Sequence, residues 1–400
     1  MIDNRYTFQK SECPVCSSTD IAVFFEICQV PVHCNSLWPT RDEAIRAPKG
    51  DIRLGFCGHC GHIFNLAFNP ELMEYTQDYE NSLHFSPCFQ SYAELLAAQL
   101  VDRYDLQGKD IIEIGCGKGD FLRLLCELGR NRGVGFDPSY VPEQNADATA
   151  ERITFIRDFY SERYASYKAD FICCRHVLEH IQFPRDFLSS VRRSIGDRFG
   201  TVVFFEVPNV LFTLRDLGIW DLIYEHCSYF SASSLSHLFT SCGFGICDLS
   251  ETYEGQFLCI EALPSQGLAD SARDSRDDLE GMACEVAAFA DQYRGKVQIW
   301  RDNLERIARA GQRAAIWGAG SKGVTFLNAL ETQDQIVYAV DINPRKQGMY
   351  LAGTGQQIMP PEFLRDDQPD VVIVMNPIYE DEIRQLTEGL ELTPEFMCAS

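Results

Sequence analysis

Three glycines at alternate positions, Gly115, Gly117 and Gly119, follow directly on a short apolar run that contains Glu113. Glycines at a strand end let the backbone turn tightly and approach a ligand, because no Cβ stands in the way. The helix expected next, over residues 121–128, points its free N–H groups at the same place. We therefore expect this loop to bind a nucleotide-like cofactor.

The spacing of the glycines distinguishes two classes of cofactor. A dinucleotide site has the pattern G-x-G-x-x-G, with a pyrophosphate at the helix N-terminus, whereas this loop reads E-x-G-x-G-x-G. The loop resembles motif I of the class I S-adenosylmethionine-dependent methyltransferases, whose cofactor carries no phosphate. The resemblance implies that Glu113, Gly115, Gly117 and Gly119 bind S-adenosylmethionine.

Polar residues also stand at the ends of the next expected strands. Asp137 ends the run 133–136 and lies 18 residues past Gly119, close to the roughly 20 expected for an acid that binds ribose hydroxyls. Asp158 ends another strand and is predicted to meet the adenine amino group. His176 follows a further apolar run, and we expect it on the cofactor side as well.

The composition excludes several classes of protein. The chain has 400 residues, 46% of them hydrophobic, and a formal net charge of −23. Such a charge opposes binding to nucleic acid, which needs clusters of Lys and Arg. Neither a signal peptide nor an apolar run of the roughly 18 residues that a membrane span requires is present. We expect a cytoplasmic protein whose 17 cysteines are mostly reduced, without nucleic-acid or membrane partners.

Four of the cysteines form two C-x₂-C pairs, Cys13 with Cys16 and Cys57 with Cys60. Two such pairs are typical of a tetrahedral Zn²⁺ site. A shell of four thiolates leaves no open position for water, so the predicted zinc is structural and holds together a small N-terminal domain.

A second glycine loop lies near the C-terminus. It has the spacing G-x-G-x-x-G after an apolar run, which alone indicates NAD. Only about 80 residues remain for a dinucleotide domain, however, and lysines in and after the loop suit a diphosphate group. The residues predicted to bind substrate are Gly318, Gly320, Lys322, Gly323, Asp341 and Lys346.

The alternating strand and helix patterns predict an α/β protein with three domains. These are a small zinc-binding domain (1–68), a central Rossmann-like methyltransferase domain (69–265) and a smaller C-terminal Rossmann-like domain (312–400). A helical linker (266–311) is expected before the last domain, because apolar residues recur there at steps of three and four.

Over nearly its full length the chain resembles the sugar C-methyltransferase family, which acts on nucleotide-linked 4-keto deoxysugars. The resemblance is carried by the cysteine pairs, the order of the domains and the segments 113–119, 176–180, 224–231, 318–328 and 341–348. In that family a histidine removes the C3 proton of the sugar, and the enolate attacks the methyl group of the cofactor. The resemblance implies a small-molecule substrate, a nucleotide-diphosphate sugar, and a monomer or small homo-oligomer.

The resemblance points to the segment around His226 for catalysis. Histidine has an unshifted pKa near 6.5 and suits a base at neutral pH, so His226 is the predicted base. In an extended segment Tyr224 would share its face and serve the oxyanion, while Glu225 would orient a neighbour from behind. His180 is the second candidate base, and Tyr79, from the connection after the zinc domain, is expected in the same cleft.

The sequence departs from the family at the substrate side. It reads Tyr-Glu-His at 224–226, where the family has Tyr-His-Glu-His, so Tyr224 is displaced by one position. O- or C-methylation of another small natural-product acceptor is therefore an alternative. An NAD-dependent oxidoreductase that uses the C-terminal glycine loop is an alternative of another class, and a non-catalytic binding protein is a third.

Overall fold

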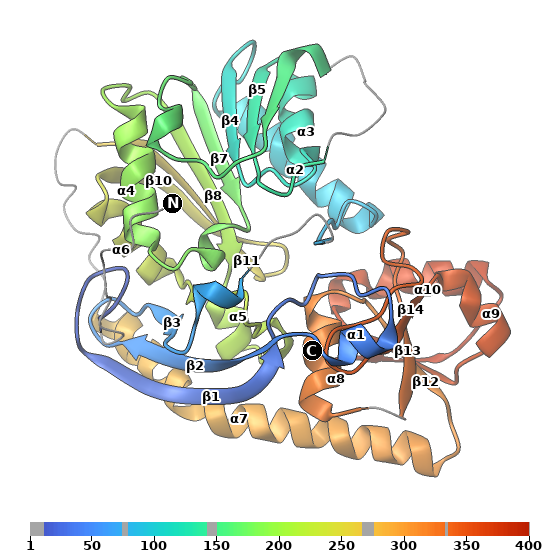
Figure 1. Ribbon diagram of the computed structural model, residues 1–400. Coiled ribbons are helices and arrows are strands. Elements are labelled where there is room, and N and C mark those ends of the chain that lie inside the picture. Colours follow the sequence, from blue (N-terminus) through green and yellow to red (C-terminus); the bar gives the residue numbers. More distant parts are fainter. Residues whose placement is uncertain (1–11, 74–78, 142–149, 266–275, 333–334, 400) are drawn as a thin grey trace.

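The computed structural model describes residues 12–73, 79–141, 150–265, 276–332 and 335–399, and three β-sheets organise these residues (Figure 1). Short 3₁₀ turns connect many of the larger elements, at Pro70–Leu72, Ala150–Arg152, Glu162–Tyr164, Leu178–His180, Ile219–Asp221, Pro361–Phe363 and Pro377–Tyr379. None of the described helices is long and apolar enough to span a membrane.

The central sheet is doubly wound. Its strand order is β10-β11-β8-β7-β4-β5-β6, parallel from β8 to β6, with β11 antiparallel to both of its neighbours. The strands are β4 (Asp110–Ile114), β5 (Arg132–Phe136), β6 (Ile153–Ile156), β7 (Phe171–Arg175), β8 (Val202–Pro208), β10 (Phe244–Thr252) and β11 (Phe257–Pro264).

Helices cover both faces of this sheet because alternate strand residues are apolar on both sides. Ile111 packs with helices α2 (Pro87–Arg103) and α3 (Asp120–Gly129). Ile112 packs on the opposite face with α4 (Pro184–Ile195) and α6 (Ala232–Ser241). The predicted α/β class is confirmed, and the carboxyl ends of the parallel strands meet at one edge.

The N-terminal sheet is antiparallel and takes in a strand from much later in the chain. It comprises β1 (Ile21–Pro31), β2 (Lys49–Cys57), β3 (Ile63–Asn65) and β9 (Ser228–Tyr229), with helix α1 (Arg41–Ile45) between β1 and β2. Tyr229 of β9 pairs with Ile63 of β3. The residues that follow His226 are therefore held by the sheet next to the cysteine pairs.

The C-terminal sheet is wholly parallel, in the order β14-β13-β12-β15-β16. Its strands are β12 (Ala314–Trp317), β13 (Ile336–Val340), β14 (Gln357–Met359), β15 (Val371–Val374) and β16 (Glu395–Cys398). Helices α8 (Ser321–Leu330), α9 (Leu364–Asp367) and α10 (Glu380–Gly389) lie between its strands in the sequence. One further short helix, α5 (Val210–Leu214), follows β8 in the central part of the chain.

The helix expected between the last two domains is present as α7 (Arg276–Arg309), while residues 266–275 lie outside the described part. Phe289 and Tyr293 of α7 contact Phe25 of β1, at ring distances of 5.1 and 4.7 Å. Trp300 contacts Phe326 of α8 at 5.1 Å. The helix thus runs beneath β1 and joins the N-terminal sheet to the C-terminal domain (Figure 1). The domain boundaries themselves stay predictions.

Candidate functional site

The four paired cysteines come together as one group. The Sγ atoms of Cys13 and Cys60 are 3.6 Å apart, as are those of Cys16 and Cys57, and all four lie within 4.8 Å of one another. Sulfur ligands about 2.3 Å from a tetrahedral zinc ion are roughly 3.8 Å apart. The group therefore has the spacing and the ligand type that fit a structural Zn²⁺.

The first glycine loop forms a cradle that only glycine can line. Gly115, Gly117 and Gly119 have φ angles of 71°, 55° and 87°, in the left-handed region that other residues rarely adopt. A Cβ on Gly115 would lie 2.2 Å from Val177, and one on Gly119 would lie 2.4 Å from Phe155. The loop follows β4 and begins helix α3.

Asp137 fastens this loop to the end of β5. The backbone N–H of Gly117 donates to its Oδ2 at 2.9 Å, and the N–H and hydroxyl of Ser139 donate to its Oδ1 at 2.8 and 2.6 Å. The carboxylate thus lies at the glycine cradle, where its remaining lone pairs suit ribose hydroxyls.

Glu113 lies beneath the cradle with an unpaired polar atom. Its side chain is 3% exposed, and Oε2 has no hydrogen-bond partner among the described residues. Burial, with smaller contributions from Asp120 and Asp137, outweighs Arg175 and raises the pKa of Glu113 to about 8. A neutral buried carboxyl with a free oxygen, next to a glycine cradle, fits a bound cofactor that carries amino and hydroxyl groups.

Asp158 has other hydrogen-bond partners than the residues of the glycine cradle. Its carboxylate accepts hydrogen bonds from the hydroxyl of Tyr164 at 2.6 Å and the N–H of Phe159 at 2.8 Å, and it also contacts Arg163. Its role toward adenine stays a prediction.

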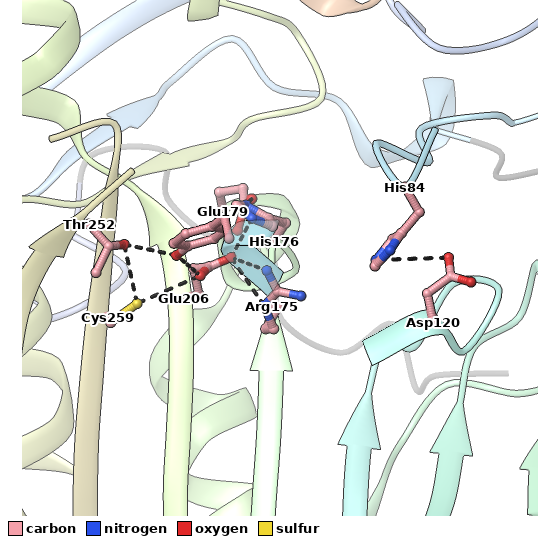
Figure 2. Close-up of polar contacts among 9 residues, drawn as sticks. His84, Asp120, Arg175, His176, Glu179, Glu206, Thr252 and Cys259 are labelled. Atoms are coloured by element: carbon pink, nitrogen blue, oxygen red, sulfur yellow. Dashed lines mark hydrogen bonds and ion pairs between the residues drawn. The ribbon is translucent and has the colours of Figure 1, made fainter. Parts of the chain in front are cut away.

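A buried carboxylate, Glu206, organises the polar groups where β7 and β8 end (Figure 2). Glu206 accepts hydrogen bonds from Arg175 at 2.8 and 3.1 Å and from the Tyr92 hydroxyl at 2.5 Å. Burial by itself would raise its pKa, but Arg175 and His176 outweigh burial and lower it well below the usual range. Glu206 is therefore ionised.

His176 pairs with this carboxylate. Its Nε2 is 2.7 Å from Glu206 and its Nδ1 is 3.7 Å from Glu179. Burial favours the neutral ring, but the two carboxylates outweigh it and raise the pKa of His176 to about 9. The backbone of His176 has a φ of 53°. The predicted cofactor-side histidine is thus a cation at neutral pH, held between two acids.

His84 was not identified from the sequence. Its Nε2 is 4.0 Å from Oδ2 of Asp120, in the first turn of α3 beside the glycine loop, as Figure 2 shows.

The segment around His226 forms a turn, so the condition under which Tyr224 and His226 would share a face, an extended segment, is not met. The N–H of His226 bonds to the carbonyl of Ile223 at 3.3 Å. The Tyr224 hydroxyl accepts a hydrogen bond from the N–H of Asn69 at 2.8 Å, and its ring stacks on Phe68. The turn sends Tyr224 toward the N-terminal sheet, and among the described residues it is absent from the pocket that His226 lines.

Glu225 is fully buried and also faces the N-terminal segment. It accepts a hydrogen bond from the N–H of Cys34 at 3.2 Å and lies 3.6 Å from Nδ1 of His33. Burial alone would raise its pKa, but the neighbouring histidines and the Cys34 N–H outweigh it, and the pKa is lowered. The backbone carbonyl of Glu225 accepts a hydrogen bond from Nδ1–H of His180 at 3.0 Å.

His226 and His180 are neighbours, with ring centroids 5.0 Å apart. Burial, followed by the positive charge of His180, lowers the pKa of His226 to about 4. The value of 6.5 expected from the sequence is therefore too high, because the ring leaves water on folding. At neutral pH His226 carries no proton on one ring nitrogen and can accept one.

The pocket beside His226 lies in the central part of the chain, and Lys322 from the C-terminal part contacts two of its residues. The pocket is lined by Pro208, Asn209, Val210, Thr213, Asp221, His226, Ser228, Tyr229 and Gln256. Lys322 of the second glycine loop donates to Asp221 at 2.8 Å and to Gln256 at 3.2 Å. The structure thus brings the predicted base and a predicted substrate residue to one place.

The second glycine loop has its own carboxylate. Asp341 accepts a hydrogen bond from the N–H of Ala319 at 3.0 Å and lies 3.6 Å from Nζ of Lys346. Gly318 has a φ of 117°, and a Cβ on Gly323 would lie 2.2 Å from the Gly318 carbonyl. At Gly320 the φ angle is −99° and an added Cβ would have no atom closer than 3.8 Å, so this position does not require glycine. Substrate binding by this loop stays a prediction.

Tyr79 lies beside the segment that follows β1. It forms an isolated β-bridge with Ser36, and its hydroxyl accepts a long hydrogen bond from Asn35 at 3.5 Å. The adjacent Glu80, which is 4% exposed, contacts Asn343 at 3.1 Å and Arg345 at 3.4 Å. This connection therefore links the N-terminal domain to the loop after Asp341.

Sequence reasoning missed Glu206, Tyr92, Asp221, Gln256 and His33 as parts of the site. Glu206 follows the apolar run 202–205, and an acid at the end of such a run was a usable signal. Gln256 lies between β10 and β11 and Asp221 in a 3₁₀ turn, where no motif marks them.

Comparisons with known proteins bear on both halves of the chain. Residues 89–249 match the family model described as a methyltransferase domain, and residues 273–398 match the model described as a C-methyltransferase C-terminal domain. The C-methyltransferase NovU of Streptomyces niveus is 28% identical over 308 residues, which cover 71% of this chain and 70% of NovU.

Shorter similarities are also present. The mitochondrial ubiquinone biosynthesis O-methyltransferase of Schizosaccharomyces pombe is 28% identical over 100 residues, 24% of this chain and 36% of that protein. Magnesium protoporphyrin IX methyltransferase of Synechocystis PCC 6803 is 18% identical with a TM-score of 0.34, over 44% of this chain and 84% of its own. The two domain matches and NovU together identify the chain as an S-adenosylmethionine-dependent methyltransferase, and its similarity to a C-methyltransferase extends over both domains.

Proposed function

We propose that the protein methylates carbon in a nucleotide-linked keto-deoxysugar. The observation that supports this most is the group of polar side chains around His226, because a proton acceptor, a carboxylate and amides line one small hollow there. Carboxylates and amides are suited to hydroxyl groups of a sugar. Lys322, which reaches this pocket from the second glycine loop, is the cation best placed for the nucleotide portion.

In this proposal His226 removes a proton from the carbon next to the ketone. Its lowered pKa keeps it neutral at pH 7, so the ring nitrogen is free of a proton before the reaction. S-adenosylmethionine, held at Gly115–Gly119 and Asp137, supplies an electrophilic methyl group when bound. The enolate of the acceptor is the nucleophile, and His180 remains the second candidate base.

Two parts of the sequence-based mechanism change. The Tyr224 hydroxyl accepts a hydrogen bond from the N–H of Asn69, so this hydroxyl does not serve the oxyanion in the proposal. Nζ of Lys346 lies 3.6 Å from Asp341. The ribose of NAD would need this carboxylate free, so the ion pair disfavours the oxidoreductase alternative. Methylation of another small acceptor remains the second candidate, because the pocket residues suit hydroxyl groups in general.

The test is transfer of a labelled methyl group. The zinc-loaded protein is incubated with [methyl-¹³C]S-adenosylmethionine and a panel of nucleotide-linked keto-deoxysugars, and products are analysed by mass spectrometry and ¹³C NMR. We expect one methyl group bonded to carbon, and a rate reduced about 100-fold or more in His226→Ala. A methyl group on oxygen, or transfer only to acceptors that lack a ketone, would refute the proposal.

A further inference from the structure

Glu179 lies where the turn of His226 meets the central sheet. It belongs to the 3₁₀ turn Leu178–His180 after β7, and its side chain is 2% exposed. Its carbonyl accepts hydrogen bonds from the N–H of Cys227 at 2.9 Å and from the Cys227 thiol at 3.5 Å. The backbone of Glu179 therefore fixes the residue that directly follows His226.

The carboxylate of Glu179 faces three histidines. One oxygen lies within 4.8 Å of a ring nitrogen of His180 and of His226. Oε1 is 3.7 Å from Nδ1 of His176, while Oε2 is buried without a hydrogen-bond partner among the described residues. A buried acceptor without a partner is costly, so this oxygen is available for a proton on one of these rings.

The other buried acid near His226 has different contacts. The carboxylate of Glu225 accepts a hydrogen bond from the N–H of Cys34 and lies 3.6 Å from His33, and its backbone carbonyl accepts one from His180. The third acid at the pocket, Asp221, is paired with Lys322. Glu225 also has one oxygen without a hydrogen-bond partner among the described residues, but that oxygen lies against His33, whereas an oxygen of Glu179 lies within 4.8 Å of a ring nitrogen of His226.

We propose that Glu179, rather than Glu225, is the positioning carboxylate that orients His226 and stabilises it once it has taken a proton. This inference rests on the proposed function. The proton leaves the acceptor carbon for a ring nitrogen of His226, and the electrons of the C–H bond remain on the acceptor as an enolate. The positive imidazolium then lies beside the negative Glu179 until the proton passes to solvent.

Glu179→Gln removes this charge and keeps the size of the side chain. We expect kcat to fall about 100-fold. The Kd of S-adenosylmethionine should change less than about threefold, because the glycine cradle does not involve Glu179 and the cofactor-side His176 keeps its closer contact with Glu206 at 2.7 Å. The pKa of His226 should fall, since an anion that favours its charged form is gone. Glu261→Gln is the matched control: this acid is also buried, but it binds Arg103 and Tyr104.

The histidine pKa is measured by NMR titration of the full-length, zinc-loaded protein with labelled histidine, without any acceptor. The chain has 8 histidines, and the His226 signal is assigned by its loss in His226→Gln. This readout tests the inference even if no sugar is methylated, which would refute the proposed function alone. Glu179→Asp, which keeps the charge, should retain part of kcat and serves if the Gln variant does not fold.

Three results would overturn the inference. One is an unchanged His226 titration in Glu179→Gln, and another is a larger shift in Glu225→Gln than in Glu179→Gln. The third is a metal ion at these side chains, since Glu179, His180 and His226 also have ligand atoms close enough for one. A second metal per chain, lost in Glu179→Gln but retained in Glu261→Gln, would make His226 a ligand instead of a base.

Discussion

The two glycine loops of this chain are held by the same hydrogen bonds. In the first, Asp137 accepts from the N–H of Gly117 at 2.9 Å and from that of Ser139 at 2.8 Å. In the second, Asp341 accepts from the N–H of Ala319 at 3.0 Å and from that of Asn343 at 2.8 Å. In both, an acid after the second strand therefore fixes the turn that follows the first strand.

The surroundings of the two acids differ. Lys346 lies 3.6 Å from Asp341 and its side chain is only 6% exposed, whereas among the described residues no lysine or arginine is paired with Asp137. Two positions before the first glycine, one strand carries Glu113 and the other the apolar Ile316. Glycine spacing thus identifies the turn, and we expect the charges around it to determine which loop binds a cofactor ribose.

Among the variants that test this comparison, Gly115→Ala should have the largest effect on the affinity for S-adenosylmethionine. A Cβ there would lie 2.2 Å from Val177, so either the loop or residue 177 must move. We expect the Kd of S-adenosylmethionine, measured by calorimetry, to rise more than about 100-fold, equivalent to about 3 kcal/mol. Gly117→Ala is the control, because its φ is also positive but no atom lies within 4 Å of the added carbon; it should cost about 1–2 kcal/mol. Equal losses in both variants would mean that backbone strain, and not space, sets the effect.

The two acids can be exchanged for alanine in parallel. Asp137→Ala should weaken S-adenosylmethionine about 10- to 100-fold, since hydrogen bonds to a charged group contribute about 1.5–3 kcal/mol. Asp341→Ala should leave this Kd within about twofold, as measured by calorimetry. If Asp341→Ala weakens the cofactor as much as Asp137→Ala, the assignment of the donor site to the first loop fails.

Lys322 tests whether the second loop serves the acceptor. Lys322→Gln removes the contact with Asp221, where both side chains are mostly buried. We expect kcat/KM for the acceptor to fall about 10-fold, roughly 1.4 kcal/mol, with the Kd of S-adenosylmethionine unchanged. Asp221→Asn should have a similar effect, and the double variant should lose less than the sum. Fully additive losses would show that the two side chains act separately.

The sequence predicted the parts of the site that depend on local pattern. Strand ends, the cysteine pairs and the glycine loops follow from spacing along the chain, so Asp137 and the group around Cys13 were found. The turn at residues 223–226 was not predicted, because it depends on β9 pairing with β3, more than 150 residues earlier. The lowered pKa of His226 was missed for the same reason, since the burial that lowers it arises only when the turn packs in the folded chain.

The smallest effect on cofactor affinity, and the clearest dependence on pH, should come from Glu113→Gln. Because the pKa of Glu113 is raised to about 8, its carboxyl is mostly protonated at pH 7, and an amide of the same shape should bind S-adenosylmethionine within about threefold. Calorimetry at pH 7 measures this ratio.

The free energy of unfolding should also distinguish the wild type from Glu113→Gln as the pH rises. An unfolded chain releases the Glu113 proton near pH 4.3, while the folded chain keeps it until about pH 8. Between these values the unfolded state binds fewer protons, so the wild type loses stability with rising pH and Glu113→Gln does not. Urea unfolding should show little difference at pH 4 and an advantage for the variant of about 1–3 kcal/mol at pH 8.5. Ile316→Val, at the matching position of the second loop, should change stability by an amount independent of pH. A pH-independent difference for Glu113→Gln as well would mean that this carboxyl is ionised in the folded protein, and that the first loop, like the second, offers the cofactor no neutral donor.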